Sequence, residues 1–152
     1  MSTDRTVWLI RHAKALGAEP GRQDIDRPLS RRGERQCEQM EVWLRDRMRR
    51  TTGPSVRVSP ARRTRQTAEL ALAHVPGERC VEPLIWNATA AALTTLVQEY
   101  DGDLVLVGHN PGMEQAQFAL TGQLMPMPTG GIFELAIGDQ GRIRLAACFR
   151  PD

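Results

Sequence analysis

Lysine is nearly missing from this 152-residue sequence, in which Lys14 is the only one. The positive charge therefore comes almost entirely from arginine, and with Lys+Arg 20 against Asp+Glu 18 the formal net charge is +2. A surface of such mixed sign argues against nucleic-acid binding, which needs a strongly basic face. Coding bias accounts for most of the arginines. Arginine also binds phosphate through a planar fork of donors, so an arginine beside a motif still merits attention.

Cysteine pairs are absent as well. Cys37, Cys80 and Cys148 are odd in number, lie far apart and form no C-x-x-C pattern. This spacing argues against a disulfide framework and against a zinc site. We expect buried thiols in a reducing cytosol, and we expect neither a metal nor a cofactor.

Long hydrophobic runs are also lacking. Residues 1–5 lead into only a short apolar stretch, too short for a signal sequence, and no later segment approaches the length of a membrane span. No repeat, low-complexity run or long linker divides the chain. With 41% apolar and 25% charged residues the chain can bury a core. We therefore expect one domain over residues 1–152, cytoplasmic and monomeric, with no membrane partner.

What the sequence does contain is an alternation of short apolar runs and amphipathic stretches. The expected strands are residues 6–10, 56–58, 80–82, 104–107, 132–137 and 142–149. The expected helices begin near Ser30, at Ser59-Pro60, before Leu93 and after Asn110-Pro111, and the second of them runs to about Val75. The last two strands form a hairpin around residues 139–141. This alternation predicts an α/β sandwich with a mostly parallel sheet and an antiparallel edge.

Three of the expected strands end in polar residues. The first ends at Arg11-His12, the second at Ser59 with Arg62 and Arg63 just beyond, and the third at His109-Asn110. Ligands of open α/β sheets bind at the carboxyl ends of the strands, so these endings can meet in one crevice. Histidines, arginines and helix N-termini together describe an anion site, and a phosphoryl group is the best candidate for the anion.

Taken singly, each of these residues has an ordinary structural explanation. A lone histidine at a strand end is more often a hydrogen-bonded structural residue, and Arg62, Arg63 and Arg65 alone are typical of a solvated helix face. His74, at a helix end without polar company, keeps the structural explanation. The joint placement at strand ends is hard to obtain by chance, and it favours a functional site over separate structural roles.

Three segments resemble the signatures of the histidine phosphatase superfamily, also called the phosphoglycerate-mutase-like superfamily. Residues 9–13 (LIRHA) resemble its R-H-G signature, residues 59–68 (SPARRTRQTA) its S-x-x-x-R-x-x-Q-T-A motif, and residues 107–110 (VGHN) its second-histidine motif. The resemblance implies a three-layer α/β/α sandwich and metal-independent phosphatase activity through a phosphohistidine enzyme intermediate.

Further segments are similar to the small SixA-type phosphohistidine phosphatases within that superfamily. They are residues 26–33 (DRPLSRRG), 108–112 (GHNPG) and 128–131 (PTGG). The resemblance spans nearly the whole chain, in order and with family-like spacing. It implies protein phosphohistidine, such as that of a phosphotransfer domain in signal transduction, as the substrate.

Position by position, the resemblance implies four site residues. His12 corresponds to the nucleophile, Arg11 and Arg63 to the arginines that clamp phosphate, and His109 to the second histidine of the phosphate pocket. The family's arginine follows the serine by four residues, which selects Arg63 and leaves Arg62 as a neighbour facing solvent. The visible departure is Ala13 in place of glycine, which is tolerated if its φ is negative.

The general acid is the part of the machinery that the sequence does not supply clearly. Glu82 is the nearby candidate, but it lies outside the family's usual motif, and a boundary charge is the favoured interpretation. A phosphohistidine substrate lessens the need for an acid, because imidazole leaves once it is protonated. Arg27 is a candidate for substrate contact, with a salt bridge to Asp24 or Asp26 as the alternative. Residues 129–131 could line the rim through backbone N–H groups.

Several functions stay open at this point. The leading hypothesis is a phosphatase for protein phosphohistidine, and the alternative within enzymes is a phosphomonoesterase acting on a small metabolite or a general phosphate ester. A phosphate-binding regulatory module without turnover is a third reading, and nucleic-acid binding a distant fourth. The expected partner is therefore a phosphorylated protein or a small phosphate ester.

Overall fold

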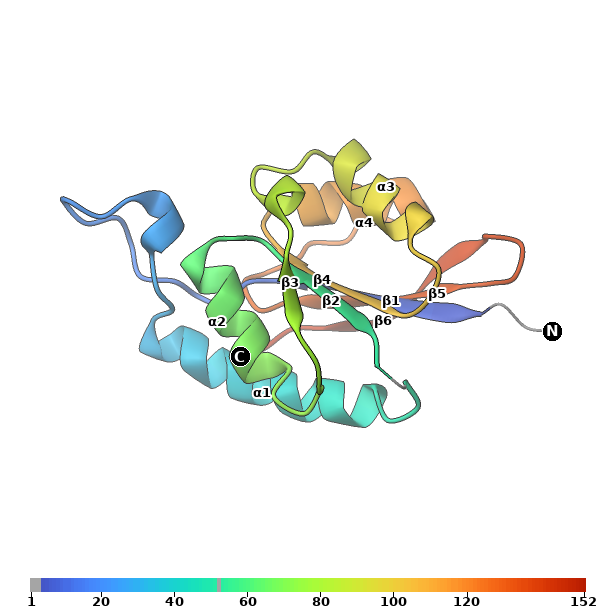
Figure 1. Ribbon diagram of the computed structural model, residues 1–152, viewed down its shortest axis with the longest axis horizontal. Coiled ribbons are helices and arrows are strands. Elements are labelled where there is room, and N and C mark those ends of the chain that lie inside the picture. The colour runs from blue at the N-terminus through green and yellow to red at the C-terminus, as the bar shows by residue number, and fades with distance from the viewer. Residues whose placement is uncertain (1–3, 52) are drawn as a thin grey trace.

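A six-stranded sheet runs through the centre of the molecule, in the order β3-β2-β4-β1-β5-β6 (Figure 1). The computed structural model describes residues 4–51 and 53–152. The strands are β1 (Arg5–Arg11), β2 (Ser55–Val58), β3 (Arg79–Val81), β4 (Leu104–Gly108), β5 (Ile132–Ile137) and β6 (Ile143–Phe149). Neighbours from β3 to β1 pair in parallel, whereas β5 and β6 pair antiparallel. The predicted mixed sheet with its closing hairpin is thus confirmed.

Helices cover both faces of this sheet. The helices are α1 (Arg31–Arg47), α2 (Arg62–Ala71), α3 (Ala90–Glu99) and α4 (Gly112–Thr121), and the short 3-10 turns are η1 (Asp24–Asp26) and η2 (Pro83–Ile85). The first two helices lie on one face, and α3 and α4 lie on the other (Figure 1). This arrangement is the predicted three-layer α/β/α sandwich.

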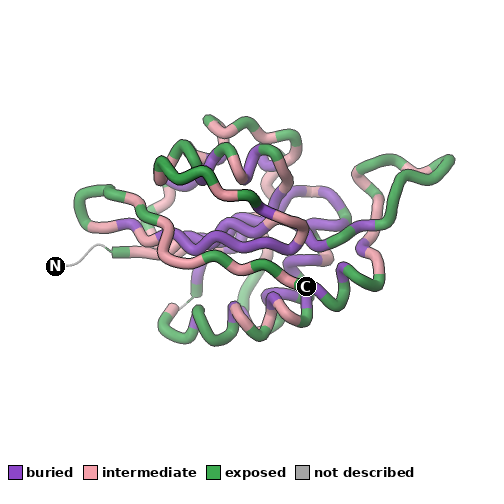
Figure 2. The backbone as a smooth tube through the Cα atoms, turned by 180° about the vertical axis from the view of Figure 1, so that it is seen from behind, coloured by how far each residue is buried: buried purple, intermediate pink, exposed green. Residues whose placement is uncertain are grey.

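The two central strands are buried because both of their faces are covered. In β1, Trp8 and Ile10 join the core beneath α1 and α2, whereas Val7 and Leu9 join the core beneath α3 and α4. All five residues of β4 are buried as well, and the buried backbone runs through the middle of the fold (Figure 2). A strand with two buried faces reads as a continuous apolar run, which is why both strands could be located from sequence.

The helix starts were predicted with mixed success. Ser30 caps α1, and its side chain accepts a hydrogen bond from the Gly33 N–H at 3.0 Å. The prediction that Ser59 and Pro60 begin the second helix was wrong, because α2 begins at Arg62. The hydroxyl of Ser59 lies instead 2.7 Å from Nε2 of His109 and is occupied there.

The cysteine prediction was correct for one residue. Cys37 is buried, and burial raises the pKa of its thiol to about 12. Cys80 and Cys148 are free and exposed, contrary to the expectation of buried thiols, because each lies in a strand near an edge of the sheet. Within residues 4–51 and 53–152, no helix is long and apolar enough to cross a membrane.

Candidate active site

The polar endings of β1, β2 and β4 meet around one cavity of about 340 Å³. Parallel pairing of β1 with β4 and of β4 with β2 aligns these ends at one edge of the sheet. The residues that line the cavity are His12, Asp24, Arg63, Trp86, Asn87, Ala88, His109, Asn110, Pro111 and Gly112. The crevice expected at the carboxyl ends of the strands is therefore present, and three of the four predicted site residues line it.

His12 is held in one tautomer by its own loop. Its Nδ1 lies 2.8 Å from the carbonyl oxygen of Ala13. A carbonyl only accepts, so Nδ1 carries the ring proton and Nε2 carries a lone pair. The residue is 9% exposed, and burial together with the charges of Arg63 and Arg11 lowers the pKa of His12 to about 4. His12 is thus a neutral imidazole at pH 7 with a free nucleophilic nitrogen.

His109 faces His12 across the cavity, with 5.3 Å between the ring centroids. Its Nε2 lies 2.7 Å from the hydroxyl of Ser59, which also accepts the Ala61 N–H at 3.3 Å. A hydroxyl that accepts from Ala61 is free to donate to His109, an arrangement that leaves the ring proton on Nδ1. Burial, His12 and Arg63 lower the pKa of His109 to about 3, so the second histidine is also neutral at pH 7.

Arg63 reaches the cavity from the first turn of α2. It is 6% exposed, whereas its neighbour Arg62 is exposed, as the spacing predicted. Its Nη1 donates to the backbone oxygen of Asp24 at 2.8 Å, and its Nη2 lies 3.2 Å from the Asp24 carboxylate. Its guanidinium carbon lies 5.5 Å from the ring centre of Trp86, as in a cation–π contact. The guanidinium is therefore fixed in the cavity wall beside an acidic residue.

Arg11 lies close to the cavity without lining it. Its Nη1 donates to the backbone oxygen of Met127 at 2.8 Å. Its charge still contributes to the low pKa of His12 and of His109. Among the described residues, Nε of Arg11 and Nε of Arg63 are both buried and have no hydrogen-bond partner. Both arginines thus keep a donor that the protein itself does not satisfy.

The remaining positions of the motif over residues 59–68 support the loops around the cavity. Gln66 accepts the Leu29 N–H at 2.8 Å, and Thr67 accepts the Ala13 N–H at 3.0 Å through its hydroxyl. One helix therefore carries Arg63 and also fixes the residue that follows His12. Ala13 has no positive φ, since Asn87 is the only non-glycine residue with one in the described part of the chain. The alanine is accommodated as expected.

Two further candidate side chains, Arg27 and Glu82, lie outside the cavity. Arg27 bonds to Asp24 at 2.9 Å and to the Leu16 oxygen at 2.7 Å, so the alternative of a salt bridge describes its contacts. Glu82 caps η2 by accepting the Leu84 N–H at 3.2 Å, which agrees with a boundary charge.

The prediction that backbone N–H groups of residues 129–131 line the rim is wrong for two of the three residues. The N–H of Gly130 donates to the His12 oxygen at 2.9 Å, and that of Gly131 donates to the Pro128 oxygen at 2.8 Å. Both groups are thus committed to the backbone, where they hold the loop that carries His12.

Sequence reasoning did not find Asp24 as a cavity residue, nor Trp86 and Asn87. Trp86 packs edge-on against His109, with 5.2 Å between ring centroids. These residues lie in irregular segments, where no periodicity indicates which way a side chain points. The usable signals were a large aromatic in a polar loop and the acidic residues beside Arg27.

The donor set of the cavity suits an anion better than a metal ion. Two neutral histidines lie beside buried guanidinium groups, which repel a cation. Within residues 4–51 and 53–152, no group of three or more His, Cys, Asp or Glu side chains is placed to hold a metal.

The fold and this constellation of residues together define a class of protein. The sequence matches the family model of the histidine phosphatase superfamily (branch 1) over residues 7–87, and the chain belongs to this superfamily. The match contains His12 and the whole motif around Arg63. No curated protein sequence matches the chain significantly.

Several solved structures are similar to this chain over nearly its whole length. A candidate phosphohistidine phosphatase SixA from Agrobacterium tumefaciens has a TM-score of 0.85 and 30% identity, over 97% of this chain and 98% of that one. A protein histidine phosphatase SixA complexed with tungstate has a TM-score of 0.79 and 24% identity, over 96% of this chain and 97% of that one. A mycobacterial glucosyl-3-phosphoglycerate phosphatase has a TM-score of 0.73 and 16% identity, over 95% of this chain and 98% of that one. The latter two establish the shared fold.

Proposed function

We propose that this protein is a metal-independent phosphatase that removes phosphate from protein phosphohistidine through a phosphoenzyme on His12. In this proposal Arg11, Arg63 and His109 bind the phosphoryl group. The observation that carries it is the pair of buried, unpartnered Nε donors on Arg11 and Arg63, close to a neutral histidine with a free nitrogen. Unused buried donors beside a nucleophile are what a phosphoryl group requires.

The chemistry follows from the tautomer of His12. Its Nε2 lone pair attacks phosphorus, a new P–N bond forms, and the bond from phosphorus to the leaving group breaks with its electron pair. Water then attacks the phosphoenzyme, which releases inorganic phosphate and restores neutral His12. The arginines stabilise the charge on the transferring oxygens, which is most of the catalysis that phosphoryl transfer needs. An incoming phosphate dianion also raises the pKa of His109 toward protonation.

The preference for phosphohistidine rests on the protonation state of the carboxylate that lines the cavity. Asp24 is the carboxylate that lines the cavity, and its bonds to Arg27 and Arg63 lower its pKa, so it is ionised near neutral pH. An ionised carboxylate cannot protonate an alkoxide leaving group. The imidazole of phosphohistidine takes its proton from solvent and leaves without such an acid. The similarity to the SixA structure from Agrobacterium tumefaciens supports the same substrate class.

A phosphomonoesterase is the second candidate. The cavity of about 340 Å³ falls within the size range of small-molecule sites. The fold is also that of the mycobacterial glucosyl-3-phosphoglycerate phosphatase. This alternative predicts that a sugar phosphate is hydrolysed at least as fast as phosphohistidine.

Rates on three substrates test the proposal. The substrates are a phosphotransfer domain phosphorylated on histidine, an aryl phosphate and a panel of sugar phosphates. We expect the highest kcat/KM on the phosphoprotein, and we expect acid quenching to lose and alkaline quenching to retain a phosphoenzyme. His12→Ala is expected to reduce turnover by at least about 1,000-fold.

His74→Ala provides the matched control. His74 lies away from the cavity, 3.6 Å from Glu41, so its variant should retain wild-type turnover. Unchanged turnover in His12→Ala contradicts the proposed mechanism. Faster hydrolysis of a sugar phosphate than of the phosphoprotein assigns the site to small metabolites instead.

A further inference from the structure

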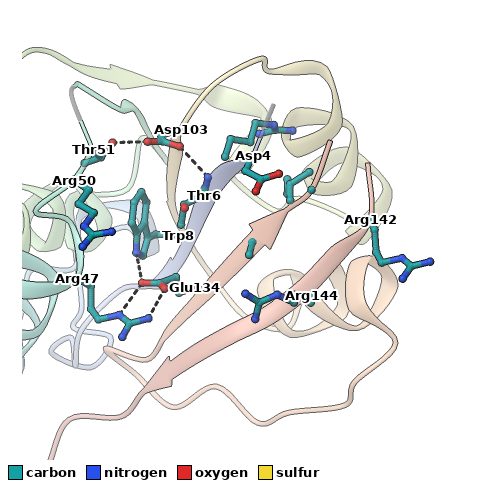
Figure 3. Close-up of a pocket in the computed structure, with 14 residues that line it drawn as sticks. Asp4, Thr6, Trp8, Arg47, Arg50, Thr51, Asp103, Glu134, Arg142 and Arg144 are labelled. Carbon is teal, nitrogen blue, oxygen red and sulfur yellow. Dashed lines mark hydrogen bonds and ion pairs between the residues drawn. The ribbon is translucent and has the colours of Figure 1, made fainter. Parts of the chain in front are cut away.

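A second cavity lies beside the first half of β1, whereas His12 follows the end of that strand. Figure 3 shows the residues that line this second cavity. The cavity has a volume of about 400 Å³ and is formed by the beginning of β1, the turn between β5 and β6, the segment after α1 and the residue before β4. Trp8 lines this second cavity and His12 lines the active site, and these two residues lie four positions apart along β1 and its end, about 13 Å at ~3.3 Å per residue. The two cavities are therefore distinct sites.

The carboxylate that forms the floor of this second cavity is already engaged. Glu134 is 7% exposed, and its two oxygens accept from the Trp8 ring N–H at 3.0 Å and from Nη2 of Arg47 at 2.6 Å. Figure 3 shows these three side chains joined in one network. The charge of Arg47 is thus compensated within the protein.

Asp103 and Arg5 are engaged as well. The Asp103 carboxylate accepts the Thr6 N–H at 2.8 Å and the Thr51 hydroxyl at 2.6 Å. Arg5 donates to the backbone oxygens of Val97 at 2.6 Å and Gly102 at 3.1 Å. These partners are neutral groups, so Asp103 and Arg5 each keep their charge, and the two charges offset one another at the cavity.

Three arginines of the cavity remain without a partner. Within the part of the chain that the structure describes, the side chains of Arg50, Arg142 and Arg144 form no hydrogen bond or ion pair, and all three line the cavity. Arg50 lies on the side of α1, Arg144 lies on β6, and Arg142 forms the outer rim (Figure 3). Five arginines and three carboxylates, including Asp4, line the cavity, so its formal net charge is +2, and the unpartnered arginine side chains lie on two opposing sides.

We propose that this second cavity binds a soluble polyphosphate, an anion with at least two linked phosphate groups. Guanidinium groups bind phosphate through paired N–H donors, so a cavity edged by free arginines favours phosphate over neutral ligands. Arg50 and Arg144 lie on different walls of the cavity, so a single phosphate group contacts only one of them. A chain of phosphates engages both.

Calorimetric titration with inorganic tripolyphosphate tests this site. All proteins carry Arg63→Ala, so that the anion clamp of the other cavity is removed and turnover does not interfere. We expect one tripolyphosphate to bind per chain, at least about tenfold tighter than inorganic phosphate. Adding Arg50→Glu or Arg144→Glu is expected to weaken tripolyphosphate binding at least about tenfold each.

Arg35→Glu is the control with the same change of charge. Arg35 is exposed on α1 and does not line the second cavity, so its variant should bind tripolyphosphate as tightly as the Arg63→Ala parent. Circular dichroism spectra check that each variant is folded. Absence of binding by the parent overturns the proposal, as does equal affinity for inorganic phosphate. An equal loss in Arg35→Glu overturns it too, because that result indicates a general charge effect.

Discussion

Asp24 is the residue that sets the charge state of the cavity before any phosphate enters. Its carboxylate lies 3.2 Å from Nη2 of Arg63 and 2.9 Å from Nη1 of Arg27. A phosphoryl group that binds Arg63 must either displace this carboxylate or accept its repulsion. Asp24 is therefore a competitor for the proposed phosphate clamp.

We predict that Asp24→Asn strengthens the binding of an oxyanion. The amide keeps the shape of the side chain but removes the negative charge, so tungstate should inhibit about threefold to tenfold more tightly. Inhibition constants measured at constant ionic strength check this. Asp26→Asn, an exposed residue of the same turn, is the control and should leave inhibition unchanged. Weaker inhibition in Asp24→Asn contradicts the competition.

The titration of the two site histidines gives another prediction at the residue scale. Burial and neighbouring arginines lower the pKa of His12 to about 4 and that of His109 to about 3, far below the usual value of 6.5. Nuclear magnetic resonance of the ring signals should therefore show both histidines neutral from pH 7 down to about pH 5. A midpoint near 6.5 for His12 contradicts the proposed electrostatics. Inorganic phosphate should shift the His109 midpoint upward.

The residues found from sequence are those whose direction follows from regular structure. His12 and His109 directly follow central strands, and Arg63 lies one step along a helix from the exposed Arg62. Asp24 and Trp86 enter the cavity from irregular segments, and their direction depends on contacts with residues far away in the chain. Such contacts leave no periodic signal in the sequence.

At the scale of elements, the beginning of α1 determines where the loop after His12 runs. The carbonyl oxygen of Lys14 accepts the Ser30 N–H at 2.9 Å and the Ser30 hydroxyl at 3.0 Å. A Cβ placed on Gly33 would overlap with that same oxygen. The helix and the loop can be this close only because Gly33 has no side chain.

We predict that Gly33→Ala lowers the free energy of unfolding by about 3 kcal/mol, because backbone atoms must move apart to admit the methyl group. Turnover should fall with it, since the displaced loop follows His12. Gly17→Ala is the matched control, with nothing within 4 Å of its added Cβ and no positive φ. Denaturant unfolding measures both. Equal stability of Gly33→Ala and the wild type contradicts the prediction.

The beginning of α2 shows why helix starts were harder to predict than strands. A serine followed by proline is typical of a helix start, yet Ser59 is instead bonded to His109 and α2 starts at Arg62. Asn110 also lies two residues before its helix, because α4 begins at Gly112. Its side chain accepts the Glu114 N–H at 3.3 Å. Residues that serve the site sit at these junctions, so local capping preferences do not decide their position.

At the scale of the whole molecule, the neutral histidines couple stability to pH. His12 and His109 bind protons in the unfolded chain near pH 6.5 but only near pH 4 and pH 3 when folded. Between these values the unfolded state binds more protons, so the free energy of unfolding falls as pH falls from about 6.5 toward 4. Above about pH 7 these two residues do not change the free energy of unfolding as pH rises.

We predict that His12→Gln combined with His109→Gln flattens this part of the stability curve. Glutamine does not titrate, so the loss of stability between pH 6.5 and pH 4.5 should be smaller than in the wild type. Melting temperatures across that range measure it. His74→Gln is the comparison, because His74 is less buried and its pKa is lowered less far. An unchanged slope in the double variant contradicts the assignment.

The sequence alone was sufficient for the identity of the strands and the fold class, but not for the order of the strands in the sheet. Apolar runs marked each strand, since burial on both faces leaves a pattern within a few residues. The order β3-β2-β4-β1-β5-β6 depends on pairing between segments far apart, such as Val7 with Leu104 and with Leu135. The resemblance to a known family supplied the architecture that local patterns could not.

The central place of β1 also bears on how the chain folds. Its two neighbours in the sheet are β4 and β5, which lie about 100 and 130 residues along the chain from its start. During synthesis both edges of the first strand therefore stay unpaired until the last third of the chain emerges. We expect slow folding and, for chains interrupted before residue 132, association through the unpaired edge of β1.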